Sequence, residues 1–440
     1  MTQGTISFET LVGMLPGLEE PPLVEAQYAA FEVAPTVLPQ FIAPTFEVME
    51  WPTNAAVLLV EAPGAVGKTV TGEALAATLK WPLIRAEKAQ VGSYSLSGIV
   101  TDALGFGDYL ARVRDSSAGL IIDSLDEAHL KAGSSNFLAF LQNIMSVGRR
   151  REQPTQPSIV LLSRSDTAEL VQLAFADAQV PIAHVRLSFF NYDAAIAYVK
   201  SYQSSRAGIT GQPQYQVALN SPQPFAHLLD LRIRQLMRVL TGNEVTDIRQ
   251  EWSHCDEFLG YAPVLTVLAE SVACTNPALE ISSLKSSGPQ SQRRILADIC
   301  ESILQREQEK LATNFRAKLQ SYLPANDPTN LEELSLYSSE EQLIRISSVV
   351  LGIPLASSLP AALPTVLHPL YDEAVQQFVL DHPFIRNKAF SSAVFQDYTH
   401  AAISNSLSAK AALSADPTAV ITRVGAFFCE FYQSLAGAGV

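Results

Sequence analysis

The sequence predicts an α/β domain with a parallel five-stranded sheet flanked by helices, followed by mostly α-helical domains. Two observations carry this prediction. Between about residues 51 and 205, short β-rich runs alternate with amphipathic helical segments, which is the pattern of a parallel sheet with crossover helices. From about residue 206 the strand-like runs fade and helical periodicity remains. With 440 residues and 48% apolar content, the chain can build several globular domains.

Four segments follow from this pattern. Residues 1–50 form a Pro-rich, acidic leader with one short helix near Val24–Phe31, and this leader is expected to pack on the next domain. Residues 51–205 form the α/β domain, residues 206–328 a helical domain, and residues 329–440 a helical C-terminal domain. No internal repeat is present, so a solenoid is not expected.

The expected elements follow the hydrophobic periodicity along the chain. The five strands of the α/β domain are Val57–Val60, Leu83–Arg85, Leu120–Asp123, Ile159–Ser163 and His184–Leu187. Helices are expected near residues 69–80, 97–114, 134–147, 166–175 and 191–203 in the same domain. Beyond it, helices are expected over 213–250, 263–275, 290–322, 330–348, 370–381, 395–410 and 417–436, with loops at 282–292 and 325–329.

Composition bears on the compartment and on the class of partner. Acidic residues number 44 and basic residues 30, and the net charge of −14 argues against non-specific binding to nucleic acid or anionic membranes. No apolar run reaches about 18 residues, so no membrane span is expected. The four cysteines match no metal or redox spacing and are expected to be buried, reduced thiols. Together with the lack of a signal peptide, they indicate a cytoplasmic protein.

The most informative segment is Ala55–Thr69, which reads AAVLLVEAPGAVGKT. An apolar strand, a Gly-rich turn and Gly67-Lys68-Thr69 follow one another, and this order is that of the P-loop of nucleoside-triphosphate enzymes. Gly64 and Gly67 let the backbone approach an anion without a clash from Cβ. Successive N–H groups and the N-terminus of the next helix then point at the phosphates.

The P-loop predicts a nucleotide site with a magnesium ion. Lys68 is expected to contact the β- and γ-phosphates, and the Thr69 hydroxyl to bind Mg²⁺. The usual first glycine of the motif is Ala62, a replacement that is tolerated if φ stays negative. The residues expected to contact the nucleotide here are Ala62, Pro63, Gly64, Ala65, Val66, Gly67, Lys68, Thr69 and Val70.

A second motif is GLIIDSLDE, residues 119–127. A buried strand ends in Asp123, which can hold the Mg²⁺ of a bound nucleotide directly or through water. A further carboxylate must orient or deprotonate the attacking water, and Glu127 or Asp126 is expected to do so. The alternative is that these acidic residues follow a strand end and cap a helix, and Asp126 is placed for capping.

A third motif is SIVLLSRSD, residues 158–166, where another buried strand ends in Ser163-Arg164. If this strand lies beside the P-loop strand, Arg164 can reach the γ-phosphate and respond to hydrolysis by losing a charge-assisted hydrogen bond. The alternative is an ordinary surface arginine at a strand end. Because this motif follows the P-loop and the GLIIDSLDE motif along the chain, the sensing role is favoured for Arg164.

Together the three motifs resemble those of the NACHT and related STAND branch of AAA+-like P-loop ATPases. The LIIDSLDEA run is the most specific part, with Ser124 in place of the small Gly usual in that family. The resemblance covers residues 50–205 well and residues 206–410 loosely. It implies a P-loop NTPase domain followed by helical domains, the last of them winged-helix-like.

Two weaker matches lie beyond the α/β domain. Gly260-Tyr-Ala-Pro263 resembles the family's G-x-P element, whose Pro contacts the adenine, so Pro263 is a candidate for that contact. The alternative is a Pro at the first position of a helix. Phe390–Tyr398, FSSAVFQDY, resembles a winged-helix segment in which a His senses the nucleotide, and Ser392 stands in place of that His. The alternative is an amphipathic core helix in which Phe395 and Tyr398 are buried.

The resemblance implies an ATP-binding and ATP-hydrolysing switch whose nucleotide state controls conformation and oligomerisation. ATP and ADP, further copies of the chain and a protein effector are the implied partners, and bacterial antiphage defence or signalling is the implied setting. ATP is the default nucleotide because no guanine-reading Asn-Lys-x-Asp is present. An Arg contributed by a neighbouring copy would accelerate hydrolysis, and Arg149–Arg151 is the only basic cluster to consider. Its alternative identity is a solvated helix C-terminus.

Two other functions remain open. An AAA+-like motor that remodels protein or nucleic acid would require an arginine finger after Arg164, and no Arg lies between Arg164 and Arg186. A non-enzymatic scaffold that keeps bound nucleotide is disfavoured by the presence of Lys68, Asp123 and Glu127.

Overall fold

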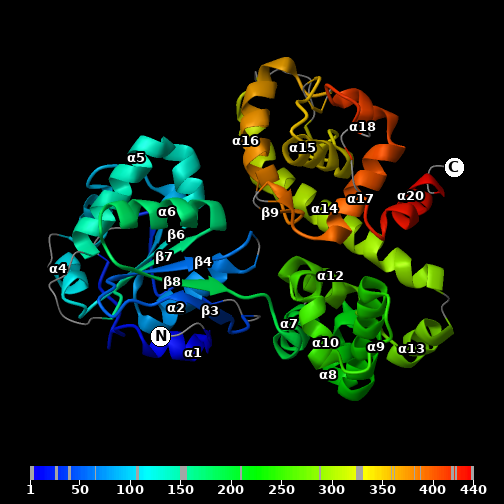
Figure 1. Ribbon diagram of the computed structural model, residues 1–440, viewed down its shortest axis with the longest axis horizontal. Helices are drawn as coiled ribbons and strands as arrows, with labels where there is room; N and C mark the ends of the chain where they lie inside the picture. The colour runs from blue at the N-terminus through cyan, green and yellow to red at the C-terminus, as the bar shows by residue number, and fades with distance from the viewer. Residues whose placement is uncertain are drawn as a thin grey trace. The chain divides into compact units, whose positions relative to one another are not determined.

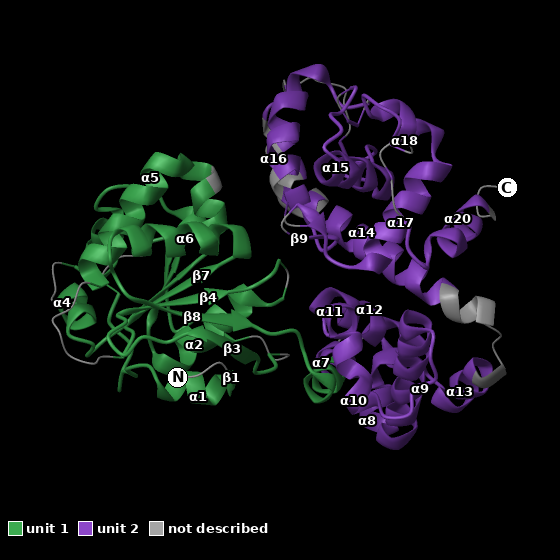
Figure 2. Ribbon diagram, in the orientation of Figure 1, with its two compact units in different colours: residues 1–201 green, residues 202–440 purple. Residues whose placement is uncertain are grey.

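The structure is a computed structural model of the chain, and it forms two compact units, Met1–Ser201 and Tyr202–Val440 (Figures 1 and 2). The boundary falls inside helix α7, Tyr192–Ala207. The residues described are 4–24, 28–37, 41–64, 66–105, 109–148, 156–208, 211–286, 289–323, 331–357, 359–360, 362–380, 382–386, 388–417, 421 and 424–437.

The first unit contains an eight-stranded, mostly parallel sheet with the order β1-β3-β8-β4-β7-β6-β5-β2. Its strands are β1 Gly4–Ser7, β2 Phe31–Val33, β3 Thr45–Glu50, β4 Val57–Glu61, β5 Pro82–Arg85, β6 Leu120–Asp123, β7 Ile159–Ser163 and β8 Ile182–Leu187. β8, β4, β7, β6 and β5 pair in parallel. β3 and β2 pair antiparallel at the two sides of this block, and β1 pairs antiparallel with β3.

The sheet is larger than expected because residues 4–50, read from sequence as a leader, supply three of its strands. The helix expected near Val24–Phe31 is wrong for the part that the structure describes, since Tyr28–Ala30 are not helical and Phe31 begins β2. A short helix, α1, instead covers Phe8–Gly13, where the Ser7 hydroxyl accepts a hydrogen bond from Thr10 N–H. Strands this short, separated by prolines, give little periodicity to detect.

Helices pack on both faces of the sheet (Figure 1). These helices include α2 Lys68–Leu79, α3 Ser95–Leu104, α5 Leu125–Gly148 and α6 Ser165–Asp177. The unit also contains α4 Tyr109–Arg114, the first part of α7 and a 3₁₀ turn η1 at Ala86–Lys88. Side chains alternate between the faces of a strand. Leu59 and Leu161 accordingly join the core with residues of α3, α5 and α6, whereas Leu162 faces Gly72 of α2. Gly72 is fully enclosed there, and an added Cβ would overlap the Leu162 side chain.

Two helical stretches of this unit are interrupted at a glycine. The helix expected over 97–114 is interrupted, because α3 ends before Gly105, which has φ of 74°. The helix expected near 134–147 is the second part of α5, which follows a kink at Gly133, where φ is 74° and ψ 160°; the first part, from Leu125 to that kink, was not expected. Such dihedrals fall outside the α-helical region and are adopted readily by glycine alone.

The described part of the second unit is mostly helical, with a two-stranded hairpin, β9 Ile385–Arg386 and β10 Ala389–Phe390, and an isolated bridge between Leu355 and Leu413. Its longer helices are α9 Pro222–Thr241, α12 Ala262–Ser271, α13 Pro277–Ser286, α14 Pro289–Ser321, α15 Ser339–Leu351, α16 His368–Leu380, α17 Ala393–Asn405 and α20 Phe428–Gly437. Short turns are η2 Pro213–Gln216, α8 Val217–Asn220, α10 Ile248–Glu251, η3 Trp252–His254, α11 Asp256–Leu259, η4 Thr365–Leu367 and α18 Leu407–Ala412.

Several sequence expectations for this unit are too coarse. The single helix expected over 213–250 is several pieces, because Pro222 starts a new helix and Gly242, with φ of 72°, ends it. The loop expected at 282–292 is instead the end of α13 and the start of α14, while the one at 325–329 lies outside the described residues. α15 begins only at Ser339, because Ser338 caps its N-terminus, and α20 only at Phe428. The helix expected over 395–410 breaks at Ser406, which caps α18.

All four cysteines are free thiols; Cys255 and Cys300 are buried as expected, but Cys429 is exposed and Cys274 half-buried. Among the described residues, no helix combines the length and the apolar character needed to cross a membrane.

Candidate functional site

The P-loop segment forms a tight connection between β4 and α2. Ala62, which directly follows β4, is buried, and its N–H donates to the Ser163 carbonyl oxygen at 3.0 Å. The turn is completed by Gly67 at φ 97° and ψ 21°, a left-handed conformation that favours glycine. Ala62 is not among the described residues with positive φ, so its methyl group is accommodated there. Ala65 lies outside the described residues.

The N-terminus of α2 is open to an anion. Gly67 is its N-cap and supplies no side chain to bond the amides of the first turn. Lys68, Thr69 and Val70 form that turn and are half-buried. Uncapped amides and the positive end of the helix dipole favour a negative charge at this position.

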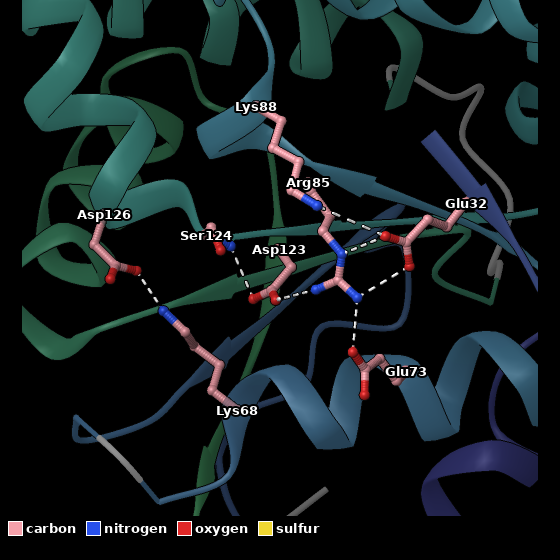
Figure 3. Close-up of polar contacts among 8 residues, drawn as sticks. All are labelled: Glu32, Lys68, Glu73, Arg85, Lys88, Asp123, Ser124 and Asp126. Carbon is pink, nitrogen blue, oxygen red and sulfur yellow. Dashed lines mark hydrogen bonds and ion pairs between the residues drawn. The ribbon is translucent and has the colours of Figure 1, made fainter. Parts of the chain in front are cut away.

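Four candidate residues from three separate motifs meet beside this turn. Lys68 Nζ contacts Asp126 Oδ1 at 2.5 Å (Figure 3). Arg164 Nε contacts Asp126 Oδ2 at 2.9 Å, and Arg164 Nη2 lies 3.9 Å from Glu127 Oε1. Lys68 begins α2, Asp126 and Glu127 lie in the first turn of α5, and Arg164 follows β7. The sheet order therefore gathers residues that are about 100 positions apart in the chain.

The charges in this group stabilise one another despite burial. Burial disfavours the charged form of Lys68, but the neighbouring carboxylates of Asp126, Glu127 and Asp123 outweigh it and raise the pKa of Lys68. Burial likewise disfavours the ionised form of Asp126, yet Lys68 and Arg164 hold the pKa of that carboxyl below its usual range. Lys68 and Asp126 thus form a buried ion pair at neutral pH.

Asp123 lies at the end of β6, fully buried, with its carboxylate beside the Lys68 pair (Figure 3). Its Oδ1 accepts a hydrogen bond from Ser124 N–H at 2.8 Å, whereas Oδ2 accepts none from the described residues. Ser124 has φ of 63°, in the region where glycine is favoured. A non-glycine residue with these dihedrals is strained by about 1 kcal/mol.

A cluster that sequence reasoning missed surrounds the other side of Asp123. Arg85, the last residue of β5, donates from Nε and Nη2 to the two carboxylate oxygens of Glu32 at 2.7 and 3.0 Å. Its Nη2 also donates to Glu73 Oε1 at 2.6 Å, and its Nη1 lies 3.9 Å from Asp123 Oδ2. We call Glu32, Glu73, Arg85 and Asp123 the Arg85 cluster (Figure 3). The signal in the sequence was that Arg85, a charged residue, ends a predicted strand. Its partners could not be predicted, because Glu32 lies in a strand that was not expected and Glu73 lies on a face of α2 that the sequence did not place beside Arg85.

A second missed cluster, the Glu61 cluster, lies at the carboxyl end of β4. The buried Glu61 carboxylate accepts from Ser165 Oγ at 2.8 Å and from Arg186 Nε at 3.1 Å, and it lies 2.9 Å from His184 Nε2. Burial disfavours its ionised form, but the hydrogen bonds from His184, Ser165 and Arg186 outweigh this and lower the pKa of Glu61 to about 2. This cluster ties β4 to β8 and to the start of α6.

Replacing Glu61 with glutamine is expected to destabilise the first unit by about 3 kcal/mol at pH 7, because a buried charged cluster loses its anion. The folded-state pKa is lowered, so the stabilising contribution is present above the unfolded value of about 4.5 and is lost as pH falls toward 2. Urea unfolding of wild type and variant at pH 7 and pH 3 should show the difference shrinking at the lower pH. An equal difference at both values would contradict the assignment. As a control, Glu47→Gln removes a more exposed partner of Arg186 and should change stability by less than about 1 kcal/mol.

The remaining candidates lie apart from this group in the chain. Pro263 is buried in the first turn of α12, in the second unit. This position agrees with the alternative that Pro263 starts a helix, and its contact with adenine stays a prediction. Ser392 is the N-cap of α17, where its hydroxyl accepts from Phe395 N–H at 3.3 Å. Arg149–Arg151 lie outside the described residues.

No dedicated metal cage is evident in the described part of the chain, where no three His, Cys, Asp or Glu side chains are grouped to hold an ion. Mg²⁺ in nucleotide sites is held by one or two protein oxygens together with phosphates and water, so Asp123 and Thr69 are a sufficient protein contribution. The buried Asp123 Oδ2, which lacks a hydrogen bond, fits that role.

Comparisons of the chain with protein-family models, with curated proteins and with solved structures found no match. The case for a function therefore stands on the side chains at the carboxyl ends of β4, β6 and β7. These side chains combine two partly buried cations, three carboxylates and an uncapped helix N-terminus at one edge of the sheet.

Proposed function

We propose that this chain is an ATP-binding and ATP-hydrolysing switch of the P-loop type, related to NACHT and STAND ATPases. The observation that carries the proposal is the meeting of Lys68, Asp126 and Arg164 beside the uncapped N-terminus of α2. Ligands of open α/β sheets bind outside the carboxyl ends of the strands, which is where these residues lie. The parallel block β8-β4-β7-β6-β5 would serve as the NTPase core.

The roles follow from charge and position. The amides that open α2 and the Lys68 ammonium group bind the β- and γ-phosphates. Asp123 and the Thr69 hydroxyl hold Mg²⁺, which neutralises phosphate charge when it is bound. Glu127 orients the attacking water, and Asp126 is the alternative for this task.

The switch is an exchange of partners by two cations. Lys68 and Arg164 both contact Asp126 in the structure. With ATP, both would turn to the γ-phosphate, and hydrolysis would return them to Asp126. The nucleotide state would set whether surfaces for oligomerisation and for an effector are exposed. Bacterial antiphage defence or signalling is the setting that the family resemblance suggests.

The proposal is tested by measuring nucleotide content, ATP turnover and molar mass of the purified chain with and without Mg·ATP. We expect bound ATP or ADP, slow turnover and an ATP-dependent increase in mass. Fast, steady turnover without a change in mass would favour an AAA+-like motor. Bound nucleotide without any turnover would favour a scaffold, and no nucleotide binding at all would refute the proposal.

Replacing Glu127 with glutamine is expected to lower ATP turnover by about 100-fold while ATP stays bound, because the water loses the carboxylate that orients it. The variant should therefore accumulate the ATP-bound, assembled state in the same mass measurement. Asp166→Asn is a matched control, since Asp166 is an exposed carboxylate in the first turn of α6. Unchanged turnover in Glu127→Gln would assign the water to Asp126.

A further inference from the structure

We propose that Arg85 is a positioning residue for Asp123, and that it thereby sets the affinity of the site for the magnesium ion of a bound nucleotide. This inference rests on the proposed function, and it concerns a residue that none of the three motifs contains. The geometry of the Arg85 cluster carries it.

The sheet brings Arg85 and Asp123 to the same place. β5 and β6 are adjacent and parallel, and Arg85 is the register partner of Asp123 at the ends of the two strands. Arg85 Nη1 lies 3.9 Å from Asp123 Oδ2, within reach for an ion pair and beyond a hydrogen bond. The Arg85 side chain is only 12% exposed and that of Asp123 is fully buried, so solvent screens this pair weakly.

Two other carboxylates, those of Glu32 and Glu73, hold the Arg85 guanidinium group in place. Glu32 of β2 accepts from Nε and Nη2, and Glu73 of α2 accepts a further bond from Nη2. A planar fork held in this bidentate way has little freedom to rotate. Nη1 is left as the nitrogen that faces Asp123 (Figure 3).

The Asp123 carboxylate is consequently held from two sides. Ser124 N–H bonds Oδ1 at 2.8 Å, and Arg85 attracts Oδ2 without forming a hydrogen bond to it. Lone pairs on Oδ2 therefore stay available for a cation. Residues that orient a metal ligand in this indirect way typically change metal affinity by about 10- to 100-fold when they are mutated.

A purely structural role is the competing explanation, because Arg85 also ties β2 and α2 to β5. If Arg85 only links these elements, its mutation should lower the stability of the protein and leave nucleotide binding by the folded protein unchanged. A positioning role predicts in addition that the magnesium dependence of nucleotide binding changes, while binding without magnesium does not.

The test measures binding of a fluorescent ATP analogue to the full chain by anisotropy, titrated with MgCl₂ and repeated in EDTA. In Arg85→Ala we expect the half-saturating magnesium concentration to rise about tenfold or more, with affinity in EDTA unchanged. Arg85→Lys should give an intermediate value, because an ammonium group keeps the positive charge but lacks the planar fork that Glu32 holds in a bidentate way. Glu32→Gln, which leaves Arg85 in place but loosens it, should shift the value in the same direction by less.

Arg186→Ala is the matched control, since Arg186 also pairs with a buried carboxylate, Glu61, at the same edge of the sheet. It should leave the magnesium dependence unchanged. The inference is overturned if Arg85→Ala stays within twofold of wild type, or if Arg186→Ala shifts the value equally. If Arg85→Ala does not fold, Arg85→Lys and Glu32→Gln decide in the same way. Absence of binding by wild type refutes the proposed function itself, whereas binding that ignores Arg85 refutes only this inference.

Discussion

Replacing Lys68 with alanine is expected to weaken ATP binding by at least about 100-fold, or roughly 3 kcal/mol. Lys68 is the cation placed at the start of α2, where the amides of the first turn are uncapped. Its ammonium group is buried and paired with Asp126, so an incoming phosphate would meet it in a weakly screened environment. Alanine keeps the helix but removes the charge, and isothermal titration with ATP in the presence of Mg²⁺ measures the loss.

The control for this experiment is Lys80→Ala, at the other end of the same helix, where Lys80 Nζ bonds the Glu19 carbonyl oxygen. Lys80→Ala should bind ATP like wild type. Thermal unfolding of both variants separates loss of binding from loss of folding, because Lys68→Ala also leaves Asp126 with Arg164 as its remaining cation. Retention of wild-type affinity in a folded Lys68→Ala protein would sink the site assignment.

The residues at the centre of the site could be predicted from sequence because each belongs to a contiguous motif. Lys68 follows a strand and a Gly-rich turn, and Asp123 and Arg164 each follow a run of buried β-formers. Such runs are local signals, and their order in the chain predicts that their carboxyl ends share one edge of a parallel sheet. That Lys68 and Arg164 would share a single carboxylate was not predictable, since it depends on side-chain geometry.

The parts that sequence reasoning missed depend on contacts across the sheet. Glu32 reaches Arg85 because β2 pairs with β5, and a three-residue edge strand carries no periodic signal. Glu61 meets His184 because β8 lies directly beside β4, although the two residues are 123 positions apart. Strand order is fixed by packing of the whole domain, which local patterns do not contain.

The largest effect on ligand-free stability near the P-loop is expected from Asp126→Asn. Asparagine has nearly the same shape, but it removes the anion that both Lys68 and Arg164 contact. Breaking a buried ion pair from one side costs about 3–5 kcal/mol, because charges remain buried without their partner. The melting temperature of the ligand-free protein should therefore fall, whereas Glu127→Gln, whose contact with Arg164 is longer at 3.9 Å, should change it less.

The same substitution should make ATP bind more tightly. Asp126 and phosphate would compete for both cations, so removing Asp126 is expected to destabilise the ligand-free protein more than the ATP-bound protein, in which phosphate would replace the carboxylate. Each 1.4 kcal/mol of this difference corresponds to about a tenfold gain in affinity. ATP should accordingly raise the melting temperature of Asp126→Asn by more than it raises that of wild type. Weaker binding would contradict this and assign Asp126 a direct part in holding the nucleotide.

The two measurements on Asp126→Asn are linked, because ligand affinity depends on the stability of the ligand-free state. A lower melting temperature without ligand, combined with tighter ATP binding, would identify the contact of Asp126 with Lys68 and Arg164 as the one that nucleotide must open.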